Sequence, residues 1–133
     1  CEACQRNEGK CVQHDDMAEI YEKLLSADVI VFASPVYFYS FNAQLKALMD
    51  RTFAIENKLK DKSAYLITTG AAPQKDYMRL ITEQFKSYLS CFENVSIGGI
   101  IIGCGTTQKG SVKSTEVMNE AYMMGMNIDK QNI

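Results

Sequence analysis

The sequence predicts an α/β fold in which helices cover both faces of a parallel sheet. Three short apolar runs, at residues 29–33, 64–68 and 95–102, alternate along the chain with segments of helical periodicity. Strands that alternate with helices form right-handed βαβ units, and these units build a parallel sheet between two helical layers. A chain of 133 residues with 47% hydrophobic residues has the size and composition of one domain with one core. We therefore expect a single three-layer domain over residues 1–133.

The first helix is predicted to begin after Asp15 and Asp16. Asp16 can cap free backbone N–H groups, and Glu19 stands three residues later, at the spacing of a capping box. Apolar residues recur at positions i, i+3, i+4 and i+7, and they form one apolar stripe of this helix: Met17, Ile20, Tyr21 and Leu24. Residues 29–33 then form a continuous apolar run rich in β-branched residues. Such a run is typical of a parallel strand that is covered on both faces.

Three further helices are predicted over residues 42–56, 76–92 and 111–126. Along the chain, the strands at 64–68 and 95–102 lie between them. Each of these helices has apolar residues at helical spacing, which we expect to face the sheet. The predicted inward-facing residues are Leu45, Leu48, Met49, Phe53, Leu80, Ile81, Phe85, Tyr88, Leu89, Val117, Ala121 and Met124.

Charge and hydropathy exclude two classes of partner. Fourteen basic and sixteen acidic residues give a net charge of -2 without a basic block, so we expect no nucleic-acid partner. No apolar run approaches the length of about 18 residues that a membrane span requires, so we expect no membrane partner. An odd number of cysteines without a secretory signal favours a reducing compartment, and we expect the protein to be cytoplasmic.

Three cysteines near the N-terminus are weak candidates for metal ligands. The five cysteines of the chain are Cys1, Cys4, Cys11, Cys91 and Cys104, and the first three form a cluster. A zinc or iron–sulfur site normally requires four ligands, and only His14 could add a fourth here. A redox dithiol and a loop with packed thiols are alternative interpretations. We expect no bound metal.

The loops that follow the strands are where α/β sheets bind ligands. Residues 34–40 are unusually aromatic for a loop, and Tyr37, Phe38 and Tyr39 cannot all turn inward. These rings could stack on a planar ligand or cover a subunit interface. The loop at 68–72 combines hydroxyl groups with small residues, which lets a ligand approach the backbone.

No side chain is predicted to act as a catalytic acid, base or nucleophile. The segment from Gly105 to Ser111 has the glycine spacing of a P-loop but lacks its lysine, which excludes a nucleoside triphosphatase. A single histidine and the absence of a nucleophile elbow give no support to acyl transfer.

Several segments together resemble the NAD(P)H-dependent FMN reductase family, which includes the iron–sulfur flavoproteins. The resemblance lies in Ser34-Pro35-Val36-Tyr37-Phe38, in Gln44 to Arg51, in Thr68-Thr69-Gly70 and in the cysteine segment up to Met17. It implies a flavodoxin-like three-layer sandwich in which this chain supplies strands three, four and five. The first βαβ unit, with the loop that holds the FMN phosphate, is then expected to be missing from this chain.

The resemblance also implies a cofactor, a substrate and an assembly. FMN would lie against residues of two loops, and NAD(P)H would be the substrate. The implied cofactor-binding residues are Ser34, Pro35, Val36, Tyr37, Phe38, Tyr39, Thr68, Thr69 and Gly70. Without the phosphate loop we expect FMN to bind weakly or not at all. No [4Fe–4S] cluster is expected, because Asn7 occupies the place of a third closely spaced cysteine.

The resulting expectation is an FMN-dependent oxidoreductase that passes electrons from NAD(P)H through the flavin to a small acceptor, such as a quinone or free flavin. By resemblance it would be a homodimer or a tetramer. The alternative is a non-catalytic electron carrier or binding module of flavodoxin type. A third possibility is a domain whose aromatic loop serves only as an interface between subunits.

Overall fold

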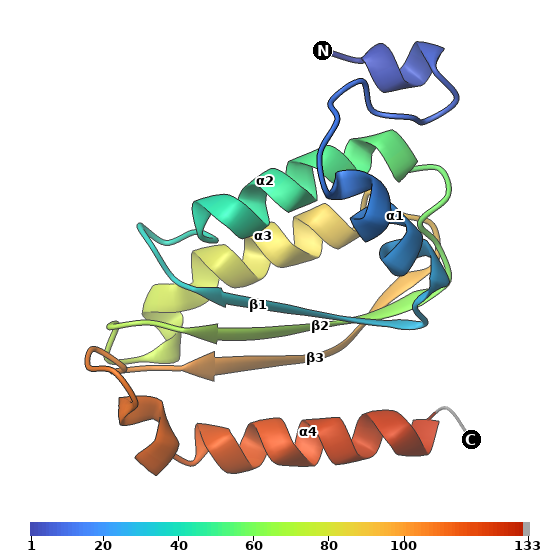
Figure 1. Ribbon diagram of the computed structural model, residues 1–133. Helices are drawn as coiled ribbons and strands as arrows, with labels where there is room; N and C mark the ends of the chain where they lie inside the picture. Colours follow the sequence, from blue (N-terminus) through green and yellow to red (C-terminus); the bar gives the residue numbers. More distant parts are fainter. Residues whose placement is uncertain (132–133) are drawn as a thin grey trace.

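The computed structural model describes residues 1–131, and it confirms the predicted alternation of helices and strands (Figure 1). The α-helices are α1 (Met17–Ser26), α2 (Ala43–Arg51), α3 (Arg79–Leu89) and α4 (Val117–Gln131). The strands are β1 (Val29–Pro35), β2 (Lys62–Thr69) and β3 (Val95–Gly103). Short 3-10 helices within the described residues are η1 (Ala3–Arg6), η2 (Thr52–Ile55), η3 (Lys75–Met78) and η4 (Ser111–Ser114).

The three strands form one parallel sheet in the order β1-β2-β3. In Figure 1, α2 and α3 lie over one face of this sheet and α4 lies over the other. The three-layer α/β architecture predicted from the sequence is therefore confirmed. The register pairs Pro35 with Thr69 and Thr69 with Gly103, so all three strands end at the same edge.

The main core lies between the sheet and the helices α2 and α3. Leu66 in the central strand and Phe85 in α3 are completely buried. Phe85 meets Phe32 of β1 edge to face, with the ring centroids 5.4 Å apart. The buried residues of this core are Phe32, Phe41, Met49, Ala64, Leu66, Met78, Ile81, Phe85 and Leu89.

Two predicted inward residues are exposed instead, Phe53 at 42% and Leu80 at 49%. The predicted second helix changes to the 3-10 helix η2 at Thr52, and its tighter winding turns Phe53 outward while Ile55 is buried. The buried stripe of α3 runs through Ile81, Phe85 and Leu89, which leaves Leu80 on its flank. These two burial predictions were wrong.

The predicted cap of α1 is also displaced by one residue. Asp16 makes no side-chain capping bond, whereas Asp15 Oδ1 accepts a hydrogen bond of 3.1 Å from the Met17 N–H. One acidic side chain thus satisfies a free N–H at this helix start, as expected, but it is the neighbouring residue.

Strand β1 is covered on one face only by the described residues. Phe32 and Ser34 are buried under the helices, whereas Val31 (48% exposed) and Ala33 lie on the opposite face. Helix α4 packs against β3 and leaves this part of the sheet open. The prediction that the strand is covered on both faces is therefore wrong for the described residues. The proline at its end, Pro35, is compatible with an edge strand because an edge needs fewer donors.

None of the helices in the described range combines the length and apolarity that crossing a bilayer requires.

Replacing the fully buried Phe85 with alanine tests the position of the core. We expect Phe85→Ala to lower the free energy of unfolding by about 3–5 kcal/mol, because a large cavity would remain between α3 and the sheet. The matched control is Leu80→Ala on the same helix, for which we expect a change within about 0.5 kcal/mol. Denaturant titration measures both, and equal losses for the two variants would contradict this packing.

Candidate functional site

Hydrogen bonds between neighbouring strands hold the first two loops side by side. The Val36 N–H donates to the Thr69 carbonyl oxygen at 2.8 Å, one residue beyond the end of β1. The Thr68 hydroxyl donates to the Ser34 carbonyl oxygen at 2.8 Å. Because both strands end at the same edge, the segments that follow them form one composite surface there.

The aromatic loop reverses direction in a tight turn. Tyr37 and Ser40 exchange backbone hydrogen bonds of 3.0 and 3.1 Å across it. The two central residues, Phe38 and Tyr39, have φ of 49° and 66°. Positive φ at both positions is the geometry of a type I′ turn, which asparagine and glycine normally occupy and which strains aromatic residues. Backbone strain of this kind is concentrated at functional sites.

The rings of this loop point away from the core. Phe38 is fully exposed, and Tyr37 and Tyr39 are more than half exposed. The strained turn therefore leaves the aromatic side chains in solvent instead of burying them. Such a surface is expected where a flat ligand or a partner binds.

The second loop approaches the first very closely at Gly70. A Cβ atom at this position would lie 3.2 Å from both the Val36 Cβ and the Met78 Cε. The Gly70 N–H donates to the Gly103 carbonyl oxygen at 2.9 Å, and the Gly70 carbonyl oxygen accepts from the Thr106 N–H at 3.0 Å. A side chain larger than that of glycine would therefore force Val36 or Met78 to shift by a few tenths of an ångström.

A cavity of about 410 Å³ lies between these two loops. Its volume is within the usual range for small-molecule sites, roughly 300–1,000 Å³. The first loop contributes aromatic and apolar side chains, and the second contributes small residues together with Tyr77 and Met78. The lining residues are Val36, Phe38, Tyr39, Gly70, Ala71, Ala72, Pro73, Tyr77 and Met78.

Four of the residues predicted to bind a cofactor line this cavity: Val36, Phe38, Tyr39 and Gly70. The buried hydroxyl groups of Ser34 and Thr68 bond within the protein instead, with Ser34 Oγ accepting from the Asn42 N–H at 3.0 Å. These two side chains brace the loops. Pro35, Tyr37 and Thr69 stand beside the cavity without lining it. That all nine contact a cofactor stays a prediction.

Sequence reasoning missed Tyr77 and Met78. Both belong to η3, where the chain leaves the second loop and enters α3. The position of Tyr77, between the loop that follows a strand and the next long helix, was the feature of the sequence that could have indicated it.

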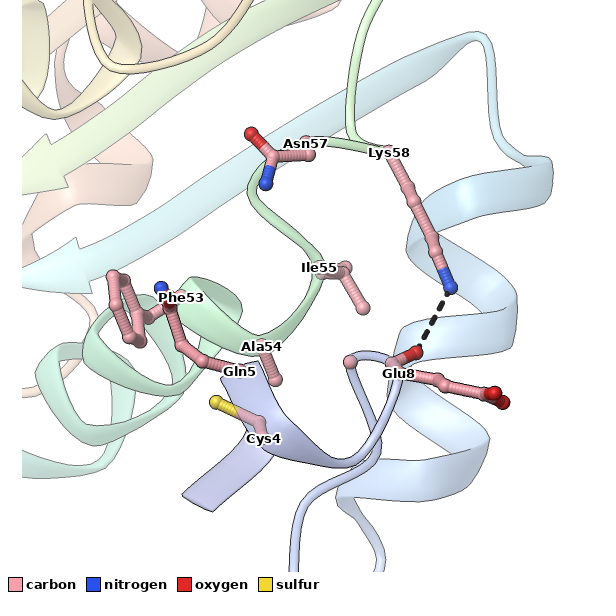
Figure 2. Close-up of a pocket in the computed structure, with 9 residues that line it drawn as sticks. Cys4, Gln5, Glu8, Phe53, Ala54, Ile55, Asn57 and Lys58 are labelled. Atoms are coloured by element: carbon pink, nitrogen blue, oxygen red, sulfur yellow. Dashed lines mark hydrogen bonds between the residues drawn. The ribbon is translucent and has the colours of Figure 1, made fainter. Parts of the chain in front are cut away.

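The cysteine segment lies apart from these loops, at the N-terminal end of the fold (Figure 1). Cys1 is exposed, Cys4 and Cys11 are half buried, and none of the three forms a disulfide. Cys4 lines a second cavity of about 400 Å³, in which Lys58 Nζ donates to the Glu8 carbonyl oxygen at 3.4 Å (Figure 2). Within the described residues, no three or more histidine, cysteine, aspartate or glutamate side chains are grouped so as to hold a metal ion.

Arg51 joins this segment to α2. Its guanidinium binds both carboxylate oxygens of Asp15, with Nη2 2.9 Å from Oδ1, and Nη2 also lies 3.6 Å from Cys11 Sγ. The Gln13 backbone N–H and the Arg51 guanidinium lower the pKa of Cys11. The same guanidinium, with the Met17 N–H, lowers the pKa of Asp15. The Cys11 sulfur thus accepts hydrogen bonds from the Gln13 N–H and the Arg51 guanidinium.

Removing the Arg51 cation tests this contact. In Arg51→Met we expect the pKa of Cys11 to rise, so a smaller fraction of this thiol is ionised near neutral pH and iodoacetamide modifies it more slowly. Mass spectrometry of the Cys11 peptide measures the rate between pH 6 and 10, with exposed Cys91 as the internal reference. The control is Lys46→Met, which removes an exposed cation from the same helix. An unchanged pH profile in Arg51→Met would show that the guanidinium does not act on Cys11.

Comparisons with known proteins agree with this architecture. Residues 2–102 match the sequence model of NADPH-dependent FMN reductases. An iron–sulfur flavoprotein of Methanosarcina thermophila is 45% identical over 75 residues, which cover 54% of this chain and 39% of that protein. A putative NAD(P)H-dependent FMN-containing oxidoreductase of Bacillus subtilis is 23% identical over 116 residues, or 80% of this chain and 64% of that protein. The match thus spans about two fifths of the length of the first of these relatives.

Solved structures are similar in fold. The Trp repressor binding protein of Bacillus subtilis superimposes with a TM-score of 0.71 at 23% identity, over 80% of this chain and 72% of that chain. A putative quinone reductase of Klebsiella pneumoniae superimposes with a TM-score of 0.66 at 16% identity, over 96% of this chain and 59% of that chain. Since the family match covers most of the residues, including both loops of the cavity, this chain belongs to the NADPH-dependent FMN reductase family.

Proposed function

We propose that this chain carries the flavin-ring site of an FMN-dependent oxidoreductase, which passes electrons from NAD(P)H to a small acceptor such as a quinone or free flavin. The observation that carries the proposal is the cavity between the two loops. A strained turn presents Phe38 and Tyr39 on one side of it, and Gly70 permits close backbone approach on the other. Membership of an FMN reductase family supports the same chemistry.

The residues present fit the ring of a flavin. Aromatic side chains stack on flat heterocycles, and the apolar Val36 and Met78 would keep water from one side of the ring. The Ala71 and Ala72 backbone N–H groups donate no hydrogen bond to the described part of the chain, so they are available to ring oxygen or nitrogen atoms. When bound, the flavin supplies the chemistry of accepting hydride and delivering electrons. The chain supplies binding, orientation and hydrogen-bond donors, with no side chain assigned as acid or base.

Steady-state oxidation of NADPH and NADH tests the function. We expect the chain, with added FMN and a quinone, to oxidise one of these nucleotides faster than FMN and quinone alone. A rate that never exceeds the protein-free rate, in protein that binds FMN, would favour the alternative of a non-catalytic electron carrier or binding module.

Truncating Phe38 tests the binding site. Because its ring is fully exposed, we expect Phe38→Ala to leave the unfolding midpoint unchanged. Losing one stacking ring, worth about 0.5–1.5 kcal/mol, should weaken flavin binding about 2- to 12-fold. The quenching of flavin fluorescence on titration with protein gives the dissociation constant. Tyr122→Ala, which removes another exposed ring on α4, is the control and should bind like the unchanged chain. Equal affinities for all three proteins would contradict the site.

A further inference from the structure

Three charged residues adjoin the lining of the cavity along the chain, where η3 continues into α3. The lining itself contains no charged side chain. Lys75 and Asp76 precede the lining residue Tyr77. Arg79 directly follows the lining residue Met78. The cavity thus has an uncharged interior, and charged groups stand next to it in the sequence.

Arg79 is the cation of this segment that has no partner. The Lys75 ammonium lies 3.9 Å from the Glu120 carboxylate. The Arg79 side chain is exposed, and within the described residues its guanidinium forms no hydrogen bond and no ion pair. Glu83, one helical turn further along α3, pairs with Lys86 at 3.0 Å. The guanidinium is therefore available to an anionic ligand.

The charge of Arg79 does not stabilise the helix that carries it. Arg79 is the first residue of α3, and the helix dipole disfavours a cation at a helix N-terminus. The backbone at this position is fixed, because the Arg79 N–H donates to the Asp76 carbonyl oxygen and the neighbouring Met78 is buried in the core. A rigid backbone thus presents an unpaired guanidinium to solvent. This placement is explained if Arg79 binds an anion.

We infer that Arg79 binds the 2′-phosphate of NADPH and thereby makes the site prefer NADPH to NADH. The inference rests on the proposed function and names the residue that distinguishes its two candidate substrates. The two nucleotides differ only in this phosphate, which the adenosine ribose carries, remote from the nicotinamide ring. A nicotinamide that faces the flavin ring at the cavity leaves the phosphate outside the uncharged lining. An exposed arginine can bind it there, because the planar guanidinium donates two parallel hydrogen bonds to a phosphate.

Binding of two adenosine nucleotides tests this contact without a flavin. Adenosine 2′,5′-bisphosphate and 5′-AMP, which differ only in the 2′-phosphate, are titrated separately into the 133-residue chain, and the shifts of its amide NMR signals give each dissociation constant. We expect the bisphosphate to bind about 3- to 10-fold more tightly than AMP, and Arg79→Met to abolish this difference.

The matched control is Lys109→Met, which removes another exposed cation, on the loop that follows β3. This variant should bind the bisphosphate more tightly than AMP, as the unchanged chain does. Equal affinities of the unchanged chain for the two nucleotides would overturn the inference. A difference that persists in Arg79→Met and is lost in Lys109→Met would also overturn it.

Steady-state kinetics separates substrate choice from a structural role of Arg79. With FMN and a quinone present, we expect Arg79→Met to raise the KM for NADPH about 3- to 10-fold and to leave kcat and the KM for NADH unchanged. Circular dichroism establishes that the variant is folded. An equal rise of KM for both nucleotides would overturn the inference and leave the proposed function standing. If neither nucleotide is oxidised, the proposed function fails, and the titration with the bisphosphate decides whether Arg79 binds the phosphate.

Discussion

The site depends on the in-register parallel pairing of β1 with β2. In this register the last residues of the two strands, Pro35 and Thr69, are paired with each other. The Val36 N–H extends the pairing by one residue, because it donates to the Thr69 carbonyl oxygen. A shift of one residue would turn Phe32 and Ser34 out of the core and separate the two loops. The buried hydroxyl of Thr68, which donates to the Ser34 carbonyl oxygen, strengthens the pairing at the point where the loops diverge.

Two features of the loops run against ordinary folding preferences. Phe38 and Tyr39 adopt a turn that glycine or asparagine would adopt without strain, and their rings are left in solvent. Neither feature stabilises the free chain. Both are explained if the rings gain a partner on binding, because a rigid turn then presents stacking surface without further ordering. Tyr77 is presented in the same way, beside the buried Met78.

Much of the fold was predictable from the sequence, because the spacing of apolar residues and the residue types distinguish the segments that form helices from those that form strands. The core residues Ile81, Phe85 and Leu89 follow directly from helical spacing. The outward turn of Phe53 was not predictable, since it arises from a change to 3-10 winding that the apolar pattern does not mark.

The site was predictable in outline. The aromatic run and the glycine indicated the two loops, but Tyr77 enters the cavity only through the three-dimensional path of η3. The difference between Phe38, which lines the cavity, and Tyr37, which does not, follows from the tight turn between Tyr37 and Ser40.

The most direct measurement is a two-dimensional ¹H–¹⁵N NMR titration of the chain with lumiflavin. If the two loops form the ring site, the amide signals that move should belong to residues 36–40 and 70–78. Signals that move instead around the cysteine segment would contradict the account.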